Sequence, residues 1–335
     1  MKFRKLDIIL MVFVLLLVFS YTNIFAADVK LTFSSIDNAG DANVEAMKVF
    51  KEEVEKLSDG HITVDVYYGG QIYTQEGELT ACLDGSLDMA YFSETNLADF
   101  IPEITMFGTA FFFRNYDHMS KVWNGEIGKK IFDEILEKSG VRPLGAFYLG
   151  TKQLFLQEQV GPVRKPEDMK GVKLRVPDGI GYIALGKALG ASPTPMSRGE
   201  LYMGLKTGTV EGQENSLLSS KNSKYHEVTK YIVLTGHKVA VVFPTMNEKK
   251  WQSLSEIDQL IIRKAIEKAR IFCDTTNLKA EAELLDFFRG EGMIIIEDID
   301  KEAFAEYAKW SYLNESKNVS DSWDMALYEE VQALK

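Results

Sequence analysis

The strongest constraint on the fold is a long region of helical periodicity that follows Pro244. Apolar residues recur every three or four positions from about Glu248 to Phe288, as expected for the buried face of a helix. A continuous helix of this length would measure roughly 60 Å at about 1.5 Å per residue, longer than a single lobe. The sequence therefore predicts a helix that lies across two lobes and joins them. Its predicted apolar face consists of Trp251, Leu254, Ile257, Ile261, Ala265, Ala269, Phe272, Leu278, Ala282, Leu285 and Phe288.

The rest of the chain alternates short strand patterns with helix patterns. Residues 29–34 and 62–66 alternate apolar and polar side chains, and residues 44–57 between them have helical spacing, which predicts a β-α-β unit. A second series begins at Val141. Its predicted strands are 141–149, 172–176 and 209–213, its predicted helices are 181–189 and 199–206, and a further strand is predicted at 293–296. Two such series predict an α/β protein of two lobes between which the chain crosses several times, the layout of a hinged clamp.

The first 26 residues have the features of a secretory signal peptide. A basic segment, Lys2–Lys5, precedes an apolar run from Ile8 to Phe19, and small residues follow at Ala26 and Ala27. A membrane anchor is the alternative, but about 12 apolar residues fall short of the roughly 20 that span a bilayer. No cysteine follows the run, so a lipid anchor is not indicated. We expect cleavage after residues 1–26 and a protein that is free in the periplasm.

Charge and cysteine content bear on several classes of function. The formal net charge of −11 makes nucleic acid and anionic lipid poor partners. The histidines and cysteines show no HExxH or CxxC spacing, so we expect no metal site and no cofactor. Cys82 and Cys273 lie in apolar, helix-like surroundings. A disulfide is one interpretation and two buried thiols are the other, which the lack of further cysteines favours.

No catalytic motif is found in the sequence. It lacks GxSxG, GxxxxGK[ST] and, after the first predicted strand, GxGxxG. The acidic pairs Glu52-Glu53 and Glu329-Glu330 lie on predicted helix faces, where solvated charge is the usual role. We therefore predict that the protein is not an enzyme. An exported enzyme acting on acidic sugars is the alternative class, and it would bring paired carboxylates together in the cleft. A sensory ligand-binding module is a third, and it would retain an anchor.

The segment from Gly171 to Asp178 is the most informative for ligand binding. Alternate apolar residues fill one face of a predicted strand, so Arg175 projects from the other face, and Pro177 ends the strand just past it. In an open α/β sheet, ligands bind in the crevice beyond the strand ends. Arg175 is therefore a candidate ligand for an anion, and a solvated strand arginine is the alternative.

Several short motifs follow one another along the chain: Asp84–Met89, Pro166–Gly171, Gly190–Met196, Gly199–Tyr202, Gly208–Asn215, Lys224–Glu227 and Lys230-Tyr231. In order and spacing they resemble the solute-binding subunits of tripartite ATP-independent periplasmic (TRAP) transporters. The resemblance covers essentially the whole chain after the leader. It implies an α/β, two-lobe periplasmic-binding-protein fold with hinge strands and one long helix spanning both lobes. We expect lobe I to comprise 27–150 plus about 240–280, and lobe II to comprise 151–239 plus about 281–335.

The resemblance also implies a binding site for a carboxylate. The family's arginine corresponding to Arg175 forms a bidentate salt bridge with the ligand carboxylate, for which a planar guanidinium is well suited. The asparagine corresponding to Asn215 donates to the same carboxylate. Lys152 stands where family members commonly have arginine, which keeps the charge and loses the fork.

Four further residues are predicted to lie at the binding site. Gln75, Ser93 and Glu94, from the first lobe, should meet the polar end of the ligand. Arg198 replaces an aromatic residue of the sialic-acid-binding branch, so an added cation would favour a second anionic or strongly hydroxylated end on the ligand. The alternative is that Arg198 begins the next helix and faces water.

The implied ligand is a small organic acid that the protein delivers to the membrane subunits of a TRAP transporter. A sugar acid such as a uronate or aldonate is the leading expectation, and a C4-dicarboxylate or a sialic-acid-like ligand is the alternative. We expect the protein to be a monomer.

Two aromatic and histidine features have simpler interpretations. Phe107 and Phe111–Phe113 could stack on a sugar, but an apolar run of this kind favours a buried strand. His237 resembles the family's histidine at the crossover between lobes, and we expect it to be structural.

Overall fold

The computed structural model describes residues 29–334, so the predicted signal peptide lies outside the described residues. Its strands form a ten-stranded sheet with the order β2-β1-β3-β9-β5-β8-β6-β7, while β4 and β10 pair with β9 beside this path. The strands are β1 (Val29–Ser34), β2 (Ile62–Tyr67), β3 (Met89–Phe92), β4 (Val141–Pro143), β5 (Phe147–Leu156), β6 (Lys173–Val176), β7 (Ser192–Pro195), β8 (Gly212–Asn215), β9 (Tyr231–Asn247) and β10 (Ile294–Ile296).

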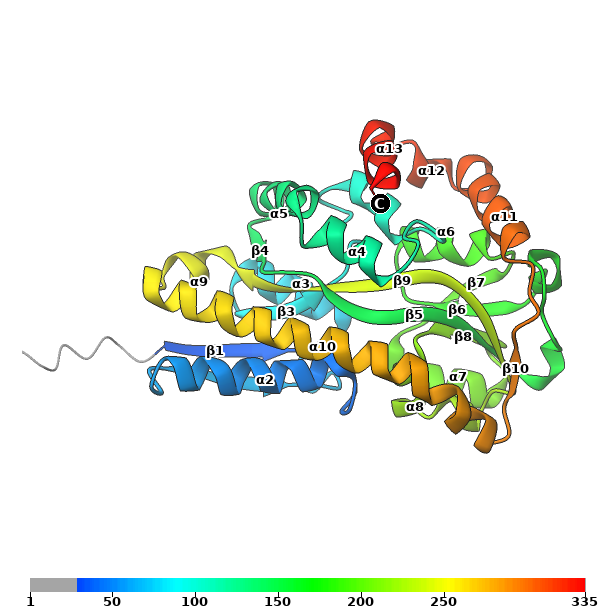
Figure 1. The fold of residues 1–335 in the computed structure, drawn as a ribbon, viewed down its shortest axis with the longest axis horizontal. Coiled ribbons are helices and arrows are strands. Elements are labelled where there is room, and N and C mark those ends of the chain that lie inside the picture. Colours follow the sequence, from blue (N-terminus) through cyan, green and yellow to red (C-terminus); the bar gives the residue numbers. More distant parts are fainter. Residues whose placement is uncertain (1–28, 335) are drawn as a thin grey trace, which may run out of the picture.

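Helices cover both faces of this sheet (Figure 1). They are α2 (Ala42–Leu57), α3 (Gln75–Asp84), α4 (Tyr116–Trp123), α5 (Glu126–Ser139), α6 (Ile180–Ala188), α7 (Leu201–Thr207), α8 (Leu217–Asn222), α9 (Glu248–Gln252), α10 (Glu256–Gly290), α11 (Lys301–Asn314), α12 (Lys317–Ser320) and α13 (Met325–Ala333). Among residues 29–334, no helix combines the length and the apolarity needed to cross a bilayer.

Two strands pass through both parts of the molecule. We call the part built on β1–β4 the first lobe and the part built on β6–β8 and β10 the second lobe. The C-terminal end of β9 pairs with β3 and β4, whereas its earlier residues pair with β5 and β10. β5 and β9 thus form a long antiparallel pair, which is interrupted by register shifts near Gly150 and Gln153. These two strands are the predicted hinge strands, and Figure 1 shows them crossing the molecule.

The long helix α10 spans both lobes, as predicted (Figure 1). Its N-terminal half packs Ile262, Ala269 and Cys273 into a cluster with α2 and β1 of the first lobe. Its C-terminal half packs Leu284 and Phe288 into a separate cluster around β5 and β9. Each half of the helix therefore buries its apolar face against a different part of the sheet.

Two details of the predicted long helix are wrong. It is divided into α9 and α10, because Ser255 starts a new helix with a capping box in which its hydroxyl accepts from the Asp258 backbone N–H. The predicted apolar face also included Ile257, Phe272, Leu278 and Ala282, which are exposed, Ile257 by 71%. The buried stripe instead runs through residues three or four apart that begin at Ile262.

Most other predicted elements lie within about three residues of their expected positions. The predicted strand 141–149 is an exception, because it is divided into β4 and β5. Between them the Asn124 side chain accepts from the backbone N–H of Ala146 at 3.3 Å and donates to its carbonyl at 3.4 Å. These two bonds take the place of ladder hydrogen bonds at Ala146.

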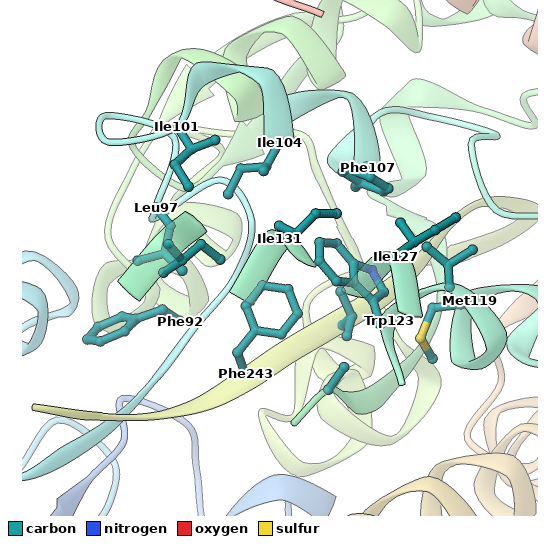
Figure 2. Packing of buried hydrophobic residues seen from close by; sticks show 14 of the residues in the cluster. Phe92, Leu97, Ile101, Ile104, Phe107, Met119, Trp123, Ile127, Ile131 and Phe243 are labelled. Atoms are coloured by element: carbon teal, nitrogen blue, oxygen red, sulfur yellow. The ribbon is translucent and has the colours of Figure 1, made fainter. Parts of the chain in front are cut away.

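The phenylalanine run does not form the predicted strand. Phe107 lies in a 3-10 helix (Pro102–Gly108), and Phe111 adopts the left-handed region with φ of 62°. Burial is nevertheless as predicted for Phe107, Phe112 and Phe113. Phe107 packs on Trp123 with ring centroids 4.7 Å apart, and Trp123 packs equally closely on Phe243 of β9 (Figure 2). These aromatic residues form the core of the first lobe and line neither cavity described below.

The C-terminal helices return from the second lobe to the first. α11 packs on α6 through Ala308 and Tyr312, whereas Val331 of α13 is buried in the aromatic cluster of the first lobe. His118 bonds the Val331 carbonyl at 2.9 Å. The C-terminal helices therefore pack on both lobes.

The two cysteines are free and buried, as the favoured interpretation predicted. Cys82 belongs to the first-lobe aromatic cluster and Cys273 to the cluster beneath α2. Burial raises the pKa of Cys82 to about 12, so this thiol is not reactive at neutral pH.

Candidate ligand-binding site

Two adjoining cavities lie between the lobes. The inner cavity has a volume of about 130 Å³ and is lined by both lobes and both hinge strands. The outer cavity has a volume of about 720 Å³ and extends from Tyr73 of the first lobe to Tyr202 of the second. Gln75 and Arg198 line both cavities. Of the predicted site residues, the inner cavity brings together Lys152, Arg175, Arg198, Asn215, Gln75 and Ser93, but not Glu94.

Arg175 is a buried cation without a carboxylate partner. It lies near the end of β6, where Leu174 packs into the core and Arg175 lines the inner cavity, and it is 6% exposed. Its Nε donates to the Met196 carbonyl at 2.9 Å, and it forms no ion pair with any carboxylate of residues 29–334. Burial lowers the pKa of Arg175. A buried charge of this kind requires a counter-ion to offset its lost hydration.

Lys152 and Asn215 meet on neighbouring hinge and second-lobe strands. β5 and β8 are antiparallel, and the Lys152 Nζ donates to the Asn215 Oδ1 at 2.8 Å. The same oxygen accepts from the Ser216 backbone N–H. The side-chain oxygen of Asn215 is therefore occupied, and its amide NH₂, which has no hydrogen-bond partner within residues 29–334, can donate to a ligand.

Glu214 lies next to Asn215 and lines the same cavity. Burial alone would raise the pKa of Glu214, but Lys152, His237 and Lys238 together lower it to about 2. His237 is fully buried, bonds Thr235 at 2.7 Å and lines neither cavity. This placement agrees with the structural role expected for His237.

The sequence analysis missed Lys238, which lines the inner cavity from β9. Its Nζ donates to the Glu94 Oε1 at 2.6 Å and lies 5.7 Å from the centroid of the Tyr182 ring. Burial would lower the pKa of Lys238, but the Glu94 carboxylate and Tyr182 raise it. Glu94 is completely buried and holds this lysine in place. A charged residue within the apolar run of β9 was the available signal.

Arg198 joins the two lobes and does not face water. Its guanidinium pairs with Asp37 at 3.0 Å and Asp41 at 2.8 Å, both from the first lobe. It also donates to Ser219 of its own lobe at 2.9 Å. Asn222 adds a further interlobe bond to Asp41 at 3.0 Å. Burial raises the pKa of Asp41 to about 6, although Arg198 opposes this shift.

The inner cavity has a further interlobe contact. The Ser93 hydroxyl of the first lobe lies 3.0 Å from the Tyr182 hydroxyl of α6, and its position is fixed by a 2.8 Å bond to Asn96. Gln75 begins α3, and Thr74 caps that helix. The interlobe contacts of Arg198 and of Ser93 show that the lobes are closed over the inner cavity.

Glu78 is a second lining residue that the sequence analysis missed. It is 2% exposed, and its Oε1 accepts from the Ser34 hydroxyl at 2.6 Å. Burial, with a smaller effect of Asp37, raises the pKa of Glu78 to about 8. This carboxyl is therefore mostly protonated at neutral pH and can donate a hydrogen bond to a ligand oxygen.

The raised pKa of Glu78 predicts a pH-dependent stability. Folded Glu78 keeps its proton up to about pH 8, whereas the unfolded chain loses it near the ordinary glutamate pKa of 4.5, so its contribution to stability falls as pH rises between these values. Glu78→Gln, which can keep the Ser34 bond, should remove this slope. We expect the variant to gain on the order of 4 kcal/mol over the wild type above about pH 8, with little difference near pH 4.5.

Urea unfolding of the ligand-free protein at about pH 5 and about pH 8.5 measures this difference. Glu76→Gln is the matched control, since Glu76 is exposed on the same helix, and its pH profile should parallel that of the wild type. Parallel profiles for Glu78→Gln as well would show that Glu78 ionises normally in the folded protein.

Two α/β lobes that are joined by an antiparallel strand pair and close over a buried cation form the architecture of a solute-binding protein. The chain matches the family model described as Bacterial extracellular solute-binding protein, family 7, over residues 33–318. It belongs to this family.

Individual relatives agree with this assignment. The sialic acid-binding periplasmic protein SiaP of Vibrio cholerae is 32% identical over 84% of this chain and 87% of that protein. A TRAP periplasmic solute binding protein of Roseobacter denitrificans with bound 3-deoxy-D-manno-oct-2-ulosonic acid has a TM-score of 0.86 and 30% identity, covering 92% of this chain and 100% of that one. A second protein from this organism, with bound L-galactonate, has a TM-score of 0.80 and 30% identity over 88% and 98% of the two chains.

These comparisons confirm the predicted class of protein and its two-lobe fold. The chain is a TRAP solute-binding protein, and its family consists of transport components and not of enzymes. The family is periplasmic. Within residues 29–334, no cluster of three or more histidine, cysteine, aspartate or glutamate side chains is arranged to hold a metal ion.

Proposed function

We propose that this protein captures a small sugar acid, such as a uronate or an aldonate, and delivers it to the membrane subunits of a TRAP transporter. The observation that carries the proposal is the buried guanidinium of Arg175, which has no carboxylate partner and lines the closed interlobe cavity. The sugar acids bound to the two Roseobacter denitrificans proteins support the same ligand class.

Five of the seven predicted site residues have a direct place in this proposal. Arg175 binds the ligand carboxylate, and the Asn215 amide donates to the same group. Lys152 lies beside Asn215 and adds positive charge. Gln75 and Ser93 contact the hydroxylated end from the first lobe. Closure of the lobes excludes water from the ion pair between Arg175 and the ligand carboxylate, and this strengthens their attraction.

The proposal includes a mature form and a division into lobes. Residues 1–26 are removed on export, and the protein acts as a monomer in the periplasm. We assign 27–150, about 240–280 and α13 to lobe I, since α13 packs on the first-lobe cluster. Lobe II comprises 151–239 and the chain from about 281 to α12. Mass spectrometry of the exported protein and size-exclusion chromatography test the first two statements.

A thermal-shift screen tests the ligand class. A ligand present at about 100 times its Kd stabilises the folded state by roughly 3 kcal/mol, which should raise the Tm by roughly 5 °C. We expect this rise with galactonate or glucuronate and none with galactose, which has hydroxyls but no carboxylate. A shift with succinate or N-acetylneuraminate alone would identify a C4-dicarboxylate or a sialic-acid-like ligand instead. No shift with any acid would contradict the proposal.

A further inference from the structure

The electrostatic pairing of the inner cavity distinguishes its cationic side chains from one another. Lys152, Arg175, Arg198 and Lys238 all line this cavity. Arg198 is paired with Asp37 and Asp41, and Lys238 is paired with Glu94. Burial lowers the pKa of Lys152, although the charge of Glu214 opposes this shift. Arg175 and Lys152 are therefore the lining cations that form no ion pair with a carboxylate of residues 29–334, and Lys152 already donates to Asn215.

We infer that Asp37 and Asp41 restrict the site to acids with a single carboxylate, because they neutralise Arg198 and add negative charge beside it. This inference rests on the proposed function and narrows its ligand class. An arginine at position 198 would suggest a second ligand end that is either anionic or strongly hydroxylated. The inference selects a hydroxylated, uncharged end.

Carboxylates outnumber the single positive charge at Arg198. One guanidinium faces two carboxylates at 3.0 and 2.8 Å, so the Asp37–Arg198–Asp41 group has an excess of negative charge when both acids are ionised. Asp37 itself lines the inner cavity. A second ligand carboxylate placed near Arg198 would be repelled by Asp37 and Asp41, and the low effective dielectric of a closed cleft strengthens that repulsion.

The inner cavity also presents both donors and acceptors of hydrogen bonds to a ligand. The Arg198 Nε is buried and has no hydrogen-bond partner in the described protein, so it can donate to a ligand oxygen. Asp37 can accept from a hydroxyl, and Gln75 can both donate and accept. Glu78, protonated at neutral pH because burial raises its pKa to about 8, supplies another donor. Hydroxyl groups satisfy such a mixture of donors and acceptors, whereas a carboxylate can only accept.

A matched pair of ligands tests the inference. Galactonate and galactarate share one carbon skeleton and differ in whether the terminal group is a hydroxymethyl or a second carboxylate. Isothermal titration calorimetry at neutral pH should show that the wild-type protein binds galactonate at least tenfold more tightly than galactarate. If another aldonate or uronate proves to be the best ligand, its own aldarate serves as the partner. Equal or tighter binding of the diacid by the wild type would overturn the inference without the use of any variant.

Variants assign the selectivity to the two carboxylates. Asp37→Asn and the double variant Asp37→Asn/Asp41→Asn keep the shape and remove the charge, and we expect the ratio of monoacid to diacid affinity to fall at least tenfold in the double variant. Glu76→Gln is the matched control, because Glu76 is a first-lobe carboxylate that lines the outer cavity but not the inner one. Its ratio should equal that of the wild type. An unchanged ratio in a folded double variant overturns the role of Asp37 and Asp41.

The outcomes separate this inference from the proposed function. Binding of a diacid that is as tight as that of its monoacid, and that depends on Arg175, overturns the single-carboxylate inference and leaves the transport receptor intact. Failure of every acid to bind overturns both.

Discussion

Replacing Arg175 with alanine is expected to weaken sugar-acid binding by roughly 30-fold to several thousand-fold. Removal of one partner from a buried, hydrogen-bonded charge pair costs about 2–5 kcal/mol, and each 1.4 kcal/mol corresponds to about a tenfold change in Kd. Arg175→Lys should lose less but still at least about tenfold, because an ammonium keeps the charge and cannot form two parallel hydrogen bonds to a carboxylate. Isothermal titration calorimetry with the best acid of the screen measures both losses.

Removing the charge of Arg175, which weakens ligand binding, should stabilise the ligand-free protein. Arg175 is buried without a carboxylate partner, so removing its charge removes a desolvation cost, and Arg175→Met should be more stable than the wild type in the absence of ligand. Arg164→Ala is the control, because Arg164 is an exposed second-lobe arginine whose Nε pairs with Asp298 at 2.8 Å. It should change neither affinity nor stability by much. Full affinity in Arg175→Ala would show that the carboxylate binds elsewhere.

The position of Arg175 could be predicted from the sequence because it depends on local rules. The alternation of residues along β6 determines which face each side chain occupies, and Pro177 marks where the strand ends. The long helix was predictable for a similar reason, since its periodicity extends over many turns. Its division at Ser255 followed from a local signal that was present in the sequence, a serine three residues before an aspartate.

The partners of the binding-site residues could not be predicted in this way. Asp41 and Arg198 are 157 residues apart in the sequence, and Glu94 and Lys238 are 144 residues apart. Each residue alone has the pattern of an ordinary polar surface or loop position. The closure of the two lobes brings them together, and only that closure shows that Arg198 is already neutralised. The sequence likewise does not show that Lys238 pairs with the Glu94 carboxylate, which was expected to meet the ligand.

For the phenylalanine run, burial could be predicted from the sequence but secondary structure could not. Its composition indicates burial, and burial is what Phe107, Phe112 and Phe113 have in common. The backbone conformation is set instead by contacts with distant residues, among them the 2.6 Å bond from the Phe111 N–H to the His237 carbonyl of β9. Hydrophobicity therefore predicted which residues are buried, but not the secondary structure in which they lie.

The buried pair of Lys238 and Glu94 gives the other large expected effect. Lys238→Met should destabilise the ligand-free protein by about 3–5 kcal/mol, because the Glu94 carboxylate would remain completely buried without its cation. Its second oxygen, Oε2, already has no hydrogen-bond partner in the described protein, so no other group is in place to compensate. Urea unfolding at neutral pH measures the loss as a change in midpoint at constant slope.

The double variant Lys238→Met/Glu94→Gln tests whether Glu94 acts by neutralising Lys238 or by contacting the ligand. With both charges removed, most of the lost stability should return, since replacing a whole buried pair costs far less than breaking it. The control is an exposed ion pair on α5, in which the Lys138 Nζ lies 2.6 Å from the Glu134 Oε1. Lys138→Met should cost less than about 1 kcal/mol of stability. If Glu94→Gln failed to rescue Lys238→Met, the cost would come from lost packing of the lysine stem against Tyr182 and not from the unpaired carboxylate. If ligand affinity fell in Glu94→Gln while stability did not, Glu94 would contact the ligand, as the sequence alone suggested.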